Sequence, residues 1–438
     1  MSLNAEPTGL LTDQYEITML RSALRDGTAA RRCVFELFAR RLPGNRRYGV
    51  VAGTGRLLDL LSRFTFDDDA VRFLRDCDVV DDETADWLGS YRFRGDIWGY
   101  AEGDVYFPGS PMLVVEASFA EAVLLETLTL SVFNHDCAIA AAAARMVTAA
   151  GDRPVIEMGS RRTHEAAAVA SARAAYVAGF ASTSNLEAGR TYGIPTAGTV
   201  AHAFVLLHDS ETDAFRAQVE SLGSGTTILV DTYDVRHAVR TAVDIAGTDL
   251  GAIRIDSGDL LNLAGQVRDE LDQLGARDTK IVVSGDLDEF QIAALAVTPA
   301  ASYGVGTSLV TGSGVPTAEL VYKLVARGTA DPDDPLEPVA KTSIGKPTRG
   351  GRKWAFRRTD EQGVADAELI NVGSADIGNG PGRPLLVPLV ENGELVWDGT
   401  LDDARKRLRA SLAELPPTAT QLSQGEPALP TYYVEQYS

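Results

Sequence analysis

Between residues 154 and 308 the sequence repeats one arrangement seven times, and this repetition constrains the fold more than any other feature. In each repeat a short apolar run is followed by small and polar residues, and helix-like segments lie between most of the repeats. The seven runs with their polar residues are PVIEMGSRR (154–162), AGFASTSN (178–185), IPTAGTVAH (194–202), TILVDTYD (227–234), AIRIDSGD (252–259), KIVVSGDLD (280–288) and SYGVGTS (302–308). Strands that alternate with helices predict β/α units and a parallel sheet. Seven units favour a barrel, but the stretch is shorter than the roughly 200 to 250 residues usual for eight. We therefore expect an irregular, incomplete α/β barrel.

The charge balance excludes several classes of partner. The 438-residue chain has a net charge of −20 and a pI of about 4.7, with 45% apolar residues. A general nucleic-acid binder needs an excess of Lys and Arg, so we expect neither nucleic acid nor an anionic membrane as partner. An acidic chain can still bind phosphates if it gathers its few cations in one cleft.

The cysteines and the lack of targeting or membrane-spanning segments predict a soluble cytoplasmic protein. Its three cysteines form no CxxC pair, which gives no zinc or disulfide framework. The N-terminus lacks the basic and apolar regions of a signal peptide, and no window of 18 apolar residues occurs. A length of 438 residues allows two or three domains.

The polar clusters of the repeats are expected on one face of the barrel. Each cluster follows its strand, and the C-terminal ends of barrel strands are where barrel enzymes place their chemistry. His202 ends the third run, in the stretch PTAGTVAHAF (195–204). A lone histidine among small and apolar residues is more often a core residue, so the residues alone leave both interpretations open. The same rim carries Glu157, Arg161, Asp231, Arg254, Asp256, Asp286 and Thr307.

One candidate cation site lies after the fifth run, in IRIDSGDL (253–260). Arg254 and Asp256 are two residues apart, so both side chains leave the same face of the strand. An aspartate beyond a strand, with Asp259 three residues later, suits Mg²⁺ and its waters beside a phosphate or a ribose diol. A salt-bridged barrel rim would give the same pattern.

Two glycine loops and an arginine pair suggest phosphate binding. VSGDLDEF (283–290) and YGVGTSLVTG (303–312) both run from strand to glycine to helix start, where backbone N–H groups favour an anion. Arg161 and Arg162 precede a helix and fit pyrophosphate or carboxylate recognition. Ordinary β/α turns and surface arginines are the alternatives.

Eight motifs in order resemble those of nicotinate phosphoribosyltransferases, and YKLV (322–325) follows them. The eight are TDQYEITM (12–19), EMGSRRTH (157–164), GFASTSN (179–185), GTVAHAF (198–204), VDTYDV (230–235), RIDSGDL (254–260), SGDLDE (284–289) and GVGTSLVT (304–311). The resemblance implies the type II phosphoribosyltransferase fold. We accordingly expect an α/β sandwich domain from residues 1–130 and 340–438, and the irregular barrel with the active site from 131–339.

The resemblance also implies a reaction and its reactants. Nicotinate and phosphoribosyl pyrophosphate would give nicotinate mononucleotide and pyrophosphate, coupled to hydrolysis of ATP, with Mg²⁺ as cofactor. This is a step of NAD salvage, carried out by a homodimer whose subunits share each active site.

The resemblance assigns roles to individual residues. His202 would be phosphorylated by ATP, and Tyr15 of the second subunit would stack on the pyridine ring. Thr199 and Arg254 would face nicotinate, Arg161 the diphosphate, and Asp256 the ribose or the metal. The catalytic set is then His202, Asp256 and Arg254; the other substrate contacts are Asp13, Asp231 and Ser257; the phosphate loops contribute Gly285, Asp286, Gly306 and Thr307; and Asp286 is the second metal candidate.

Other functions remain compatible with the residues. A quinolinate phosphoribosyltransferase binds two carboxylates and would need a richer Arg/Lys pocket, and a nicotinamide enzyme would need an acid near the amide. A non-catalytic barrel that binds a phosphorylated metabolite would be stabilised by phosphoribosyl pyrophosphate without releasing pyrophosphate.

Overall fold

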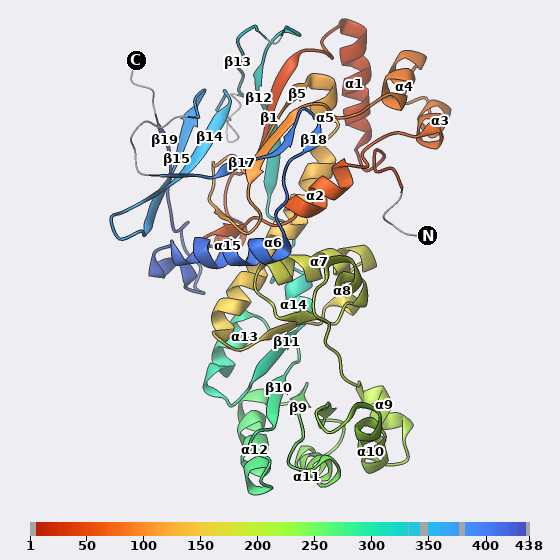
Figure 1. Cartoon of the computed structure of the whole chain (residues 1–438), viewed down its shortest axis with the longest axis vertical. Coiled ribbons are helices and arrows are strands. Elements are labelled where there is room, and N and C mark those ends of the chain that lie inside the picture. Colours follow the sequence, from red (N-terminus) through yellow and green to blue (C-terminus); the bar gives the residue numbers. More distant parts are fainter. Residues whose placement is uncertain (1–5, 332, 342–348, 376–381, 435–438) are drawn as a thin grey trace. The chain divides into compact units, whose positions relative to one another are not determined.

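The computed structural model describes residues 6–331, 333–341, 349–375 and 382–434 (Figure 1). The chain forms two compact units. Unit 1 combines Met1–Ala138 with Thr317–Ser438, and unit 2 is Ile139–Pro316. A unit made of two chain segments means that the chain leaves the first fold, builds the second, and returns.

Unit 2 is built on a six-stranded sheet in which every neighbouring pair is parallel. Its strands are β6 (Val155–Glu157), β7 (Ser182–Thr183), β8 (Thr227–Leu229), β9 (Ala252–Ile255), β10 (Lys280–Val283) and β11 (Ser302–Val305). The order β7-β6-β11-β10-β9-β8 brings the first and last strands of the repeat side by side. The sheet confirms the predicted α/β class and the irregular, incomplete barrel.

Helices connect these strands, and the N-caps of the helices account for some of the polar residues that follow each apolar run. The elements are α7 (Glu165–Val177), α8 (Leu186–Tyr192), α9 (His202–Leu207), α10 (Glu211–Leu222), α11 (Val235–Ala246), α12 (Leu260–Gln273), α13 (Glu289–Ala294), α14 (Thr307–Val310), η2 (Ser160–Arg162) and η3 (Leu295–Val297). Asn185, Asp234, Asp259 and Asp288 each accept a backbone N–H of the helix that follows. Polar residues after a strand therefore start helices as well as supply chemistry.

The third predicted strand, 194–202, is wrong. The segment makes only an isolated bridge between Thr196 and Thr183, beside the edge strand β7. Pro195 has no N–H to donate, so the pairing cannot extend backwards as a regular ladder. At the other end the Thr199 hydroxyl donates to the carbonyl oxygen of Thr227, which opens β8 (2.6 Å). The segment thus runs from β7 to β8, the two edges of the open sheet.

The described residues of unit 1 form three sheets. The seven-stranded sheet has the order β13-β12-β1-β5-β3-β17-β18, the four-stranded sheet the order β16-β14-β15-β19, and β2 pairs with β4. The strands are β1 (Arg32–Ala39), β2 (Gly49–Val50), β3 (Asp96–Tyr100), β4 (Val105–Tyr106), β5 (Leu113–Ser118), β12 (Leu320–Arg327), β13 (Glu337–Pro338), β14 (Lys353–Thr359), β15 (Ala365–Val372), β16 (Arg383–Pro384), β17 (Leu386–Glu391), β18 (Glu394–Leu395) and β19 (Thr431–Val434).

One helix of unit 1 packs directly on the large sheet, and a second helix packs on the first. Helix α5 contacts β1 and β5, and α1 contacts α5 in turn. The elements are η1 (Pro43–Asn45), α1 (Gln14–Asp26), α2 (Thr54–Leu61), α3 (Asp68–Asp76), α4 (Asp82–Gly89), α5 (Phe119–Val123), α15 (Leu401–Ala413) and η4 (Pro417–Thr420). Helix α6 (Glu126–Ala150) begins in unit 1, and its residues from Ile139 onward belong to unit 2. Asp13 occupies the N-cap position of α1, but its side chain makes no capping hydrogen bond.

The chain returns to unit 1 earlier than the expected boundary at residue 340. Strand β12 begins at Leu320 and pairs antiparallel with β1 along seven residues of that strand. This pairing joins positions almost 300 residues apart, and local sequence carries no signal for it. The first boundary differs less, since unit 1 extends to Ala138 and we expected its first segment to end at residue 130.

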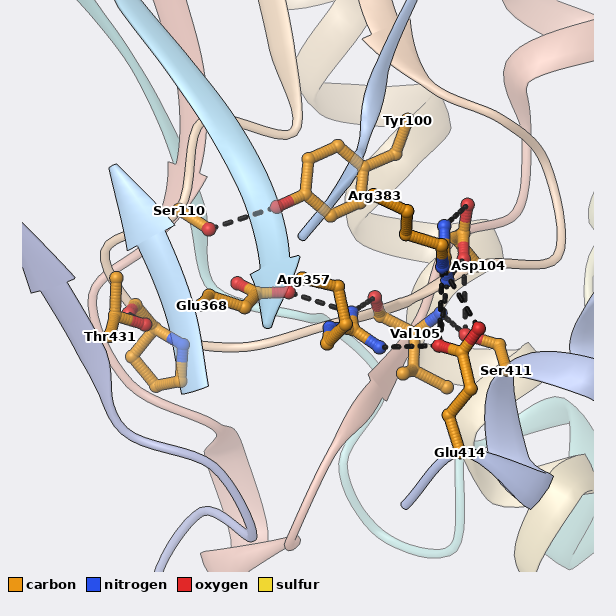
Figure 2. A network of polar contacts seen from close by, with 11 residues as sticks. Tyr100, Asp104, Val105, Ser110, Arg357, Glu368, Arg383, Ser411, Glu414 and Thr431 are labelled. Carbon is orange, nitrogen blue, oxygen red and sulfur yellow. Dashed lines mark hydrogen bonds and ion pairs between the residues drawn. The ribbon is translucent and has the colours of Figure 1, made fainter. Parts of the chain in front are cut away.

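A buried polar network holds the returning chain in unit 1 (Figure 2). Arg357 on β14 and Glu368 on β15 are cross-strand partners, both with fully buried side chains, and an Arg357 Nη2–Glu368 Oε1 ion pair of 2.7 Å joins them. The same Nη2 donates to the carbonyl oxygen of Val105 (2.8 Å). Arg383 pairs with Asp104 (2.6 Å) and with Glu414 (2.9 Å). The network therefore ties both strands and α15 to the β4 region.

Candidate active site

A cavity of about 510 Å³ lies in unit 2 at the carboxyl ends of the parallel strands. This volume falls in the usual range for small-molecule sites. Five of the predicted site residues line it, namely Arg161, Thr199, His202, Arg254 and Asp256. The other lining residues are Met158, Ser160, Ser184, Ala197, Gly198, Val200, Ala201, Ala203 and Leu229.

A fixed guanidinium forms one wall of the cavity. Arg254, on β9, donates from Nε to Ser284 Oγ (2.9 Å) and from Nη2 to Asp256 Oδ1 (2.7 Å). Ser284 Oγ donates to the same Asp256 oxygen (2.5 Å), which closes a three-residue ring of hydrogen bonds. Arg254 is only 9% exposed. Its plane is thus set before any ligand arrives, which suits recognition of a planar anion.

The environment of Asp256 keeps its carboxylate ionised. Partial burial raises its pKa, but the Ser284 hydroxyl and the charge and hydrogen bond of Arg254 outweigh that effect. The net result is a pKa below the ordinary range for aspartate. A negative charge next to the cavity is therefore present at neutral pH.

His202 begins helix α9 with both ring nitrogens near polar groups. Its Nδ1 lies 3.1 Å from Thr232 Oγ1, and its Nε2 lies 3.9 Å from Asp231 Oδ1. The second distance is too long for a hydrogen bond but within ion-pair range. The His202 side chain is 40% exposed, so the ring is no part of the apolar core.

Asp231 is held from the opposite side. Its Oδ2 accepts from the Asp256 backbone N–H (3.0 Å) and from Ser257 Oγ (2.6 Å). Its Oδ1 is buried and has no hydrogen-bond partner among the described residues. A buried carboxylate oxygen without a donor favours a hydrogen-bond donor or a positive charge beside it.

Glu157 anchors the turn that carries Arg161. This side chain ends β6 and is fully buried, and its two oxygens accept from the Gly159 backbone N–H and the Thr183 hydroxyl. Burial raises the pKa of Glu157, and these two hydrogen bonds oppose the rise. Asn185 Nδ2 donates to Ser160 Oγ (2.9 Å) on the same turn. Arg161, on this turn, lines the cavity.

The predicted phosphate loops lie in the turns after β10 and β11. Gly285 has a φ of +113°, and Asp286 has a φ of +48°. A Cβ at Gly285 would lie 2.2 Å from the backbone oxygen of Asp256. Gly306 precedes α14, and Thr307 is the first residue of that helix. The four residues of these loops are not among those that line the cavity, so their role in phosphate binding stays a prediction.

Replacing Gly285 with alanine is expected to damage the site through the backbone. The left-handed φ and the contact with Asp256 both forbid a side chain, so the turn must shift. We expect a loss of roughly 1–3 kcal/mol in the free energy of unfolding, with lower turnover because Asp256 moves. Urea unfolding and steady-state rates measure both effects. Gly265→Ala, inside α12 with open space at its Cβ, is the matched control; it should keep the rate and raise stability by roughly 0.5–1 kcal/mol, because alanine favours a helix interior over glycine. A loss of stability and rate in both variants would contradict the prediction.

Two predicted substrate residues belong to unit 1 and are not part of this cavity. Asp13 is exposed at the N-cap of α1, and Tyr15 is 46% exposed in the first turn. Their contribution to a second subunit's site stays a prediction. The sequence analysis did not predict Ser284 and Thr232 as site residues. Both lie in motifs quoted there: Ser284 directly follows β10, and Thr232 directly follows Asp231.

Neither a protein-built metal cage nor a membrane span is found in the described part of the chain. No group of three or more His, Cys, Asp or Glu side chains that could hold a metal ion occurs among the described residues. Within the same residues, the helices are too short or too polar to cross a bilayer.

Comparisons with known proteins agree with this architecture. Residues 10–134 match the model of the nicotinate phosphoribosyltransferase N-terminal domain, and residues 139–313 match that of the quinolinate phosphoribosyl transferase C-terminal domain. A nicotinate phosphoribosyltransferase of Mycobacterium tuberculosis is 59% identical over 98% of this chain and 96% of its own length. One of Bacillus subtilis is 38% identical over 80% of this chain and 72% of its own length.

A solved structure shares the fold over nearly the whole chain. The crystal structure of human nicotinic acid phosphoribosyltransferase aligns with a TM-score of 0.82 and 25% identity, and covers 97% of this chain and 98% of the human one. Likeness along the full length, in sequence and in structure, leaves one assignment. The chain belongs to the nicotinate phosphoribosyltransferase family.

Proposed function

We propose that this protein transfers the phosphoribosyl group of phosphoribosyl pyrophosphate to nicotinate, giving nicotinate mononucleotide and pyrophosphate, as a step of NAD biosynthesis from nicotinate. The relatives named above carry this activity in their names, and 59% identity brings it to this chain. The observation that carries the proposal is the fixed guanidinium of Arg254 in the cavity wall. A planar cation with two N–H groups already anchored suits the single carboxylate of nicotinate.

The transfer requires charge stabilisation at two places. The C1–O bond to pyrophosphate breaks as the pyridine nitrogen bonds to C1, so positive charge develops on the sugar and negative charge leaves with pyrophosphate. The ionised Asp256 offsets the first, and Arg161 offsets the second. The Thr199 hydroxyl donates its proton to the carbonyl oxygen of Thr227. Thr199 can therefore contact the nicotinate ring through its hydroxyl oxygen or its backbone, but not as a hydroxyl donor.

Mg²⁺ is the proposed cofactor, and the donor set fits it. Asp256 lines the cavity, and Asp231 Oδ1 is a buried acceptor without a donor among the described groups. Mg²⁺ typically takes one or two carboxylates plus substrate phosphates, so it needs no larger cluster. When bound, it would neutralise charge on the leaving pyrophosphate. Asp256 and Asp286 are the proposed ligands, and Asp231 is an additional acceptor that the structure offers.

ATP is the proposed co-substrate, with His202 as the phosphoryl acceptor. A ring nitrogen attacks the γ-phosphorus, the bond to the β-phosphate oxygen breaks, and ADP leaves. Water later attacks the phosphohistidine, which returns the imidazole and releases phosphate. Asp231 and Thr232 support this role because they set the ring's orientation and offset its positive charge.

A homodimer is proposed because the N-terminal residues present unburied apolar surface. Leu10, Leu11 and Tyr15 are 45%, 53% and 46% exposed. Large apolar side chains close together in sequence and open to water suit burial against a second copy. Tyr15 would then stack on the nicotinate of the neighbouring subunit.

Product formation with three pyridines tests the proposed reaction. We expect nicotinate to exceed nicotinamide and quinolinate in kcat/KM by roughly a hundredfold, because nicotinamide offers Arg254 no carboxylate and quinolinate brings a second carboxylate that needs a further cation. Mononucleotide and pyrophosphate release are measured with phosphoribosyl pyrophosphate, Mg²⁺ and ATP. Preference for either competitor would contradict the assignment. Thermal stabilisation by phosphoribosyl pyrophosphate without pyrophosphate release would instead show a binding protein.

A further inference from the structure

Glu16 is a fully buried carboxylate beside the proposed ring-stacking residue. It follows Tyr15 in the first turn of α1 and has 0% exposed surface. Among the described residues it forms no ion pair, and its polar partners are two threonines. Burying a carboxylate without a cation costs free energy, so a contact of this kind calls for an explanation.

The Glu16 carboxylate joins the starts of two helices. Its Oε1 accepts from the backbone N–H (2.8 Å) and the hydroxyl (2.6 Å) of Thr127. Thr127 is the second residue of α6, where a helix has no internal acceptor for its N–H. The second oxygen of Glu16, Oε2, accepts from the hydroxyl of Thr12, which lies just before α1. A negative charge from one helix therefore caps the positive end of another.

Tyr15 adjoins Glu16 in the first turn of α1 and is only partly covered, with 46% of its surface exposed. Burial and the charge of Glu126 raise the pKa of the Tyr15 phenol to about 12, while the Thr127 side chain opposes that rise. Burial also raises the pKa of Glu16 to about 7, against the hydrogen bonds from Thr127. Two adjacent residues of one turn thus differ in exposure: Glu16 is fixed inside, and Tyr15 remains partly open.

We infer that Glu16 is a positioning residue for Tyr15. By bonding Thr127 and Thr12 it fixes the first turn of α1 on the first turn of α6, and this fixes the direction in which the exposed face of Tyr15 points. The inference rests on the proposed function, in which that face stacks on nicotinate in the neighbouring subunit. Glu16 itself touches neither substrate nor reacting atoms.

A double-mutant cycle in the full-length enzyme tests this role. The variants are Tyr15→Ala, Glu16→Ala and the double variant, with the nicotinate KM and kcat measured at pH 8. We expect each single change to raise KM roughly three- to tenfold with kcat nearly kept, the range of one aromatic stack. The double variant should match Tyr15→Ala alone, because Glu16 acts through Tyr15.

Two further variants separate positioning from folding. Glu16→Gln keeps an oxygen that accepts from Thr127 and should restore most of the KM lost in Glu16→Ala. Ser22→Ala, on an exposed position of the same helix, should leave KM unchanged. If Glu16→Ala does not fold, Thr127→Val replaces it, since it removes the hydroxyl that donates to Glu16.

The outcomes test the shared active site and the positioning role of Glu16 separately. An unchanged KM in Tyr15→Ala would overturn the shared site and the inference together. A raised KM in Tyr15→Ala with an unchanged KM in Glu16→Ala would overturn the inference alone. Effects that multiply in the double variant would mean that Glu16 acts independently of Tyr15, which also overturns it.

Discussion

Replacing His202 with alanine is expected to stop nicotinate-dependent ADP release. The variant has no ring nitrogen to accept the γ-phosphoryl group, so ADP formation in the presence of phosphoribosyl pyrophosphate and Mg²⁺ should fall about a thousandfold or more, to background. Nucleotide formation should persist at a reduced, ATP-independent rate, because Arg254 and Asp256 remain in place. Coupled detection of ADP and of nicotinate mononucleotide in parallel measures the two effects separately.

A second histidine of the same helix region gives the matched control. His208 follows α9, hydrogen-bonds through Nδ1 to the Phe204 carbonyl (2.8 Å) and packs on the Phe204 ring, with 4.7 Å between ring centroids. His208→Ala should therefore keep nicotinate-dependent ADP release. Undiminished ADP release in His202→Ala would show that the imidazole is not the energy-coupling nucleophile.

Replacing Arg357 with methionine is expected to destabilise the protein by about 3–5 kcal/mol. Methionine fills similar space but leaves the Glu368 carboxylate fully buried without its cation. Burial already raises the pKa of Glu368 despite Arg357, so the lone carboxylate must take up a proton or unfold its surroundings. Urea unfolding monitored by tryptophan fluorescence measures the change.

The neighbouring arginine of the same strand is the control. Arg358 pairs with Asp366 at 2.8 Å, but the two side chains are 36% and 48% exposed. Arg358→Met should cost less than about 1 kcal/mol, as exposed ion pairs do. The double variant Arg357→Met/Glu368→Leu should recover much of the loss, since two apolar side chains leave no buried charge. Equal costs at positions 357 and 358 would refute a special role for burial.

The local pattern of the sequence was enough to predict the class of fold and part of the site. Each strand, its polar end and the following helix are neighbours in the chain, so their order appears directly as a repeat. Because all six strands of unit 2 run parallel, their carboxyl ends meet at one edge, and His202, Arg254 and Arg161 reach one cavity from distant positions. Six of the eight motifs that identified the family lie at these strand ends, whereas TDQYEITM lies at the start of α1 in unit 1 and GTVAHAF at the start of α9.

The partners of those residues were beyond the sequence. Ser284 reaches Arg254 only because β10 pairs with β9 in a register that sets Val283 opposite Ile255. The expected strand at 194–202 became a connection across the open edge of the sheet, a result that depends on how far the barrel closes. Asp231, predicted to contact substrate, has Oδ1 3.9 Å from His202 Nε2 and without a hydrogen bond from the described residues, which no local pattern indicates.

The sequence by itself determined the parallel barrel, the edge that carries the chemistry and the family, because these follow from residues adjacent in the chain. Tertiary structure alone decided the pairing of β12 with β1, the ion pair of Arg357 with Glu368, and the capping of α6 by Glu16. Each of these joins separate elements, and burial makes the choice. From sequence alone, a charged residue is expected at the surface. Only the packed structure shows which carboxylates are buried away from water and therefore need a hydrogen-bond or ion-pair partner in the core.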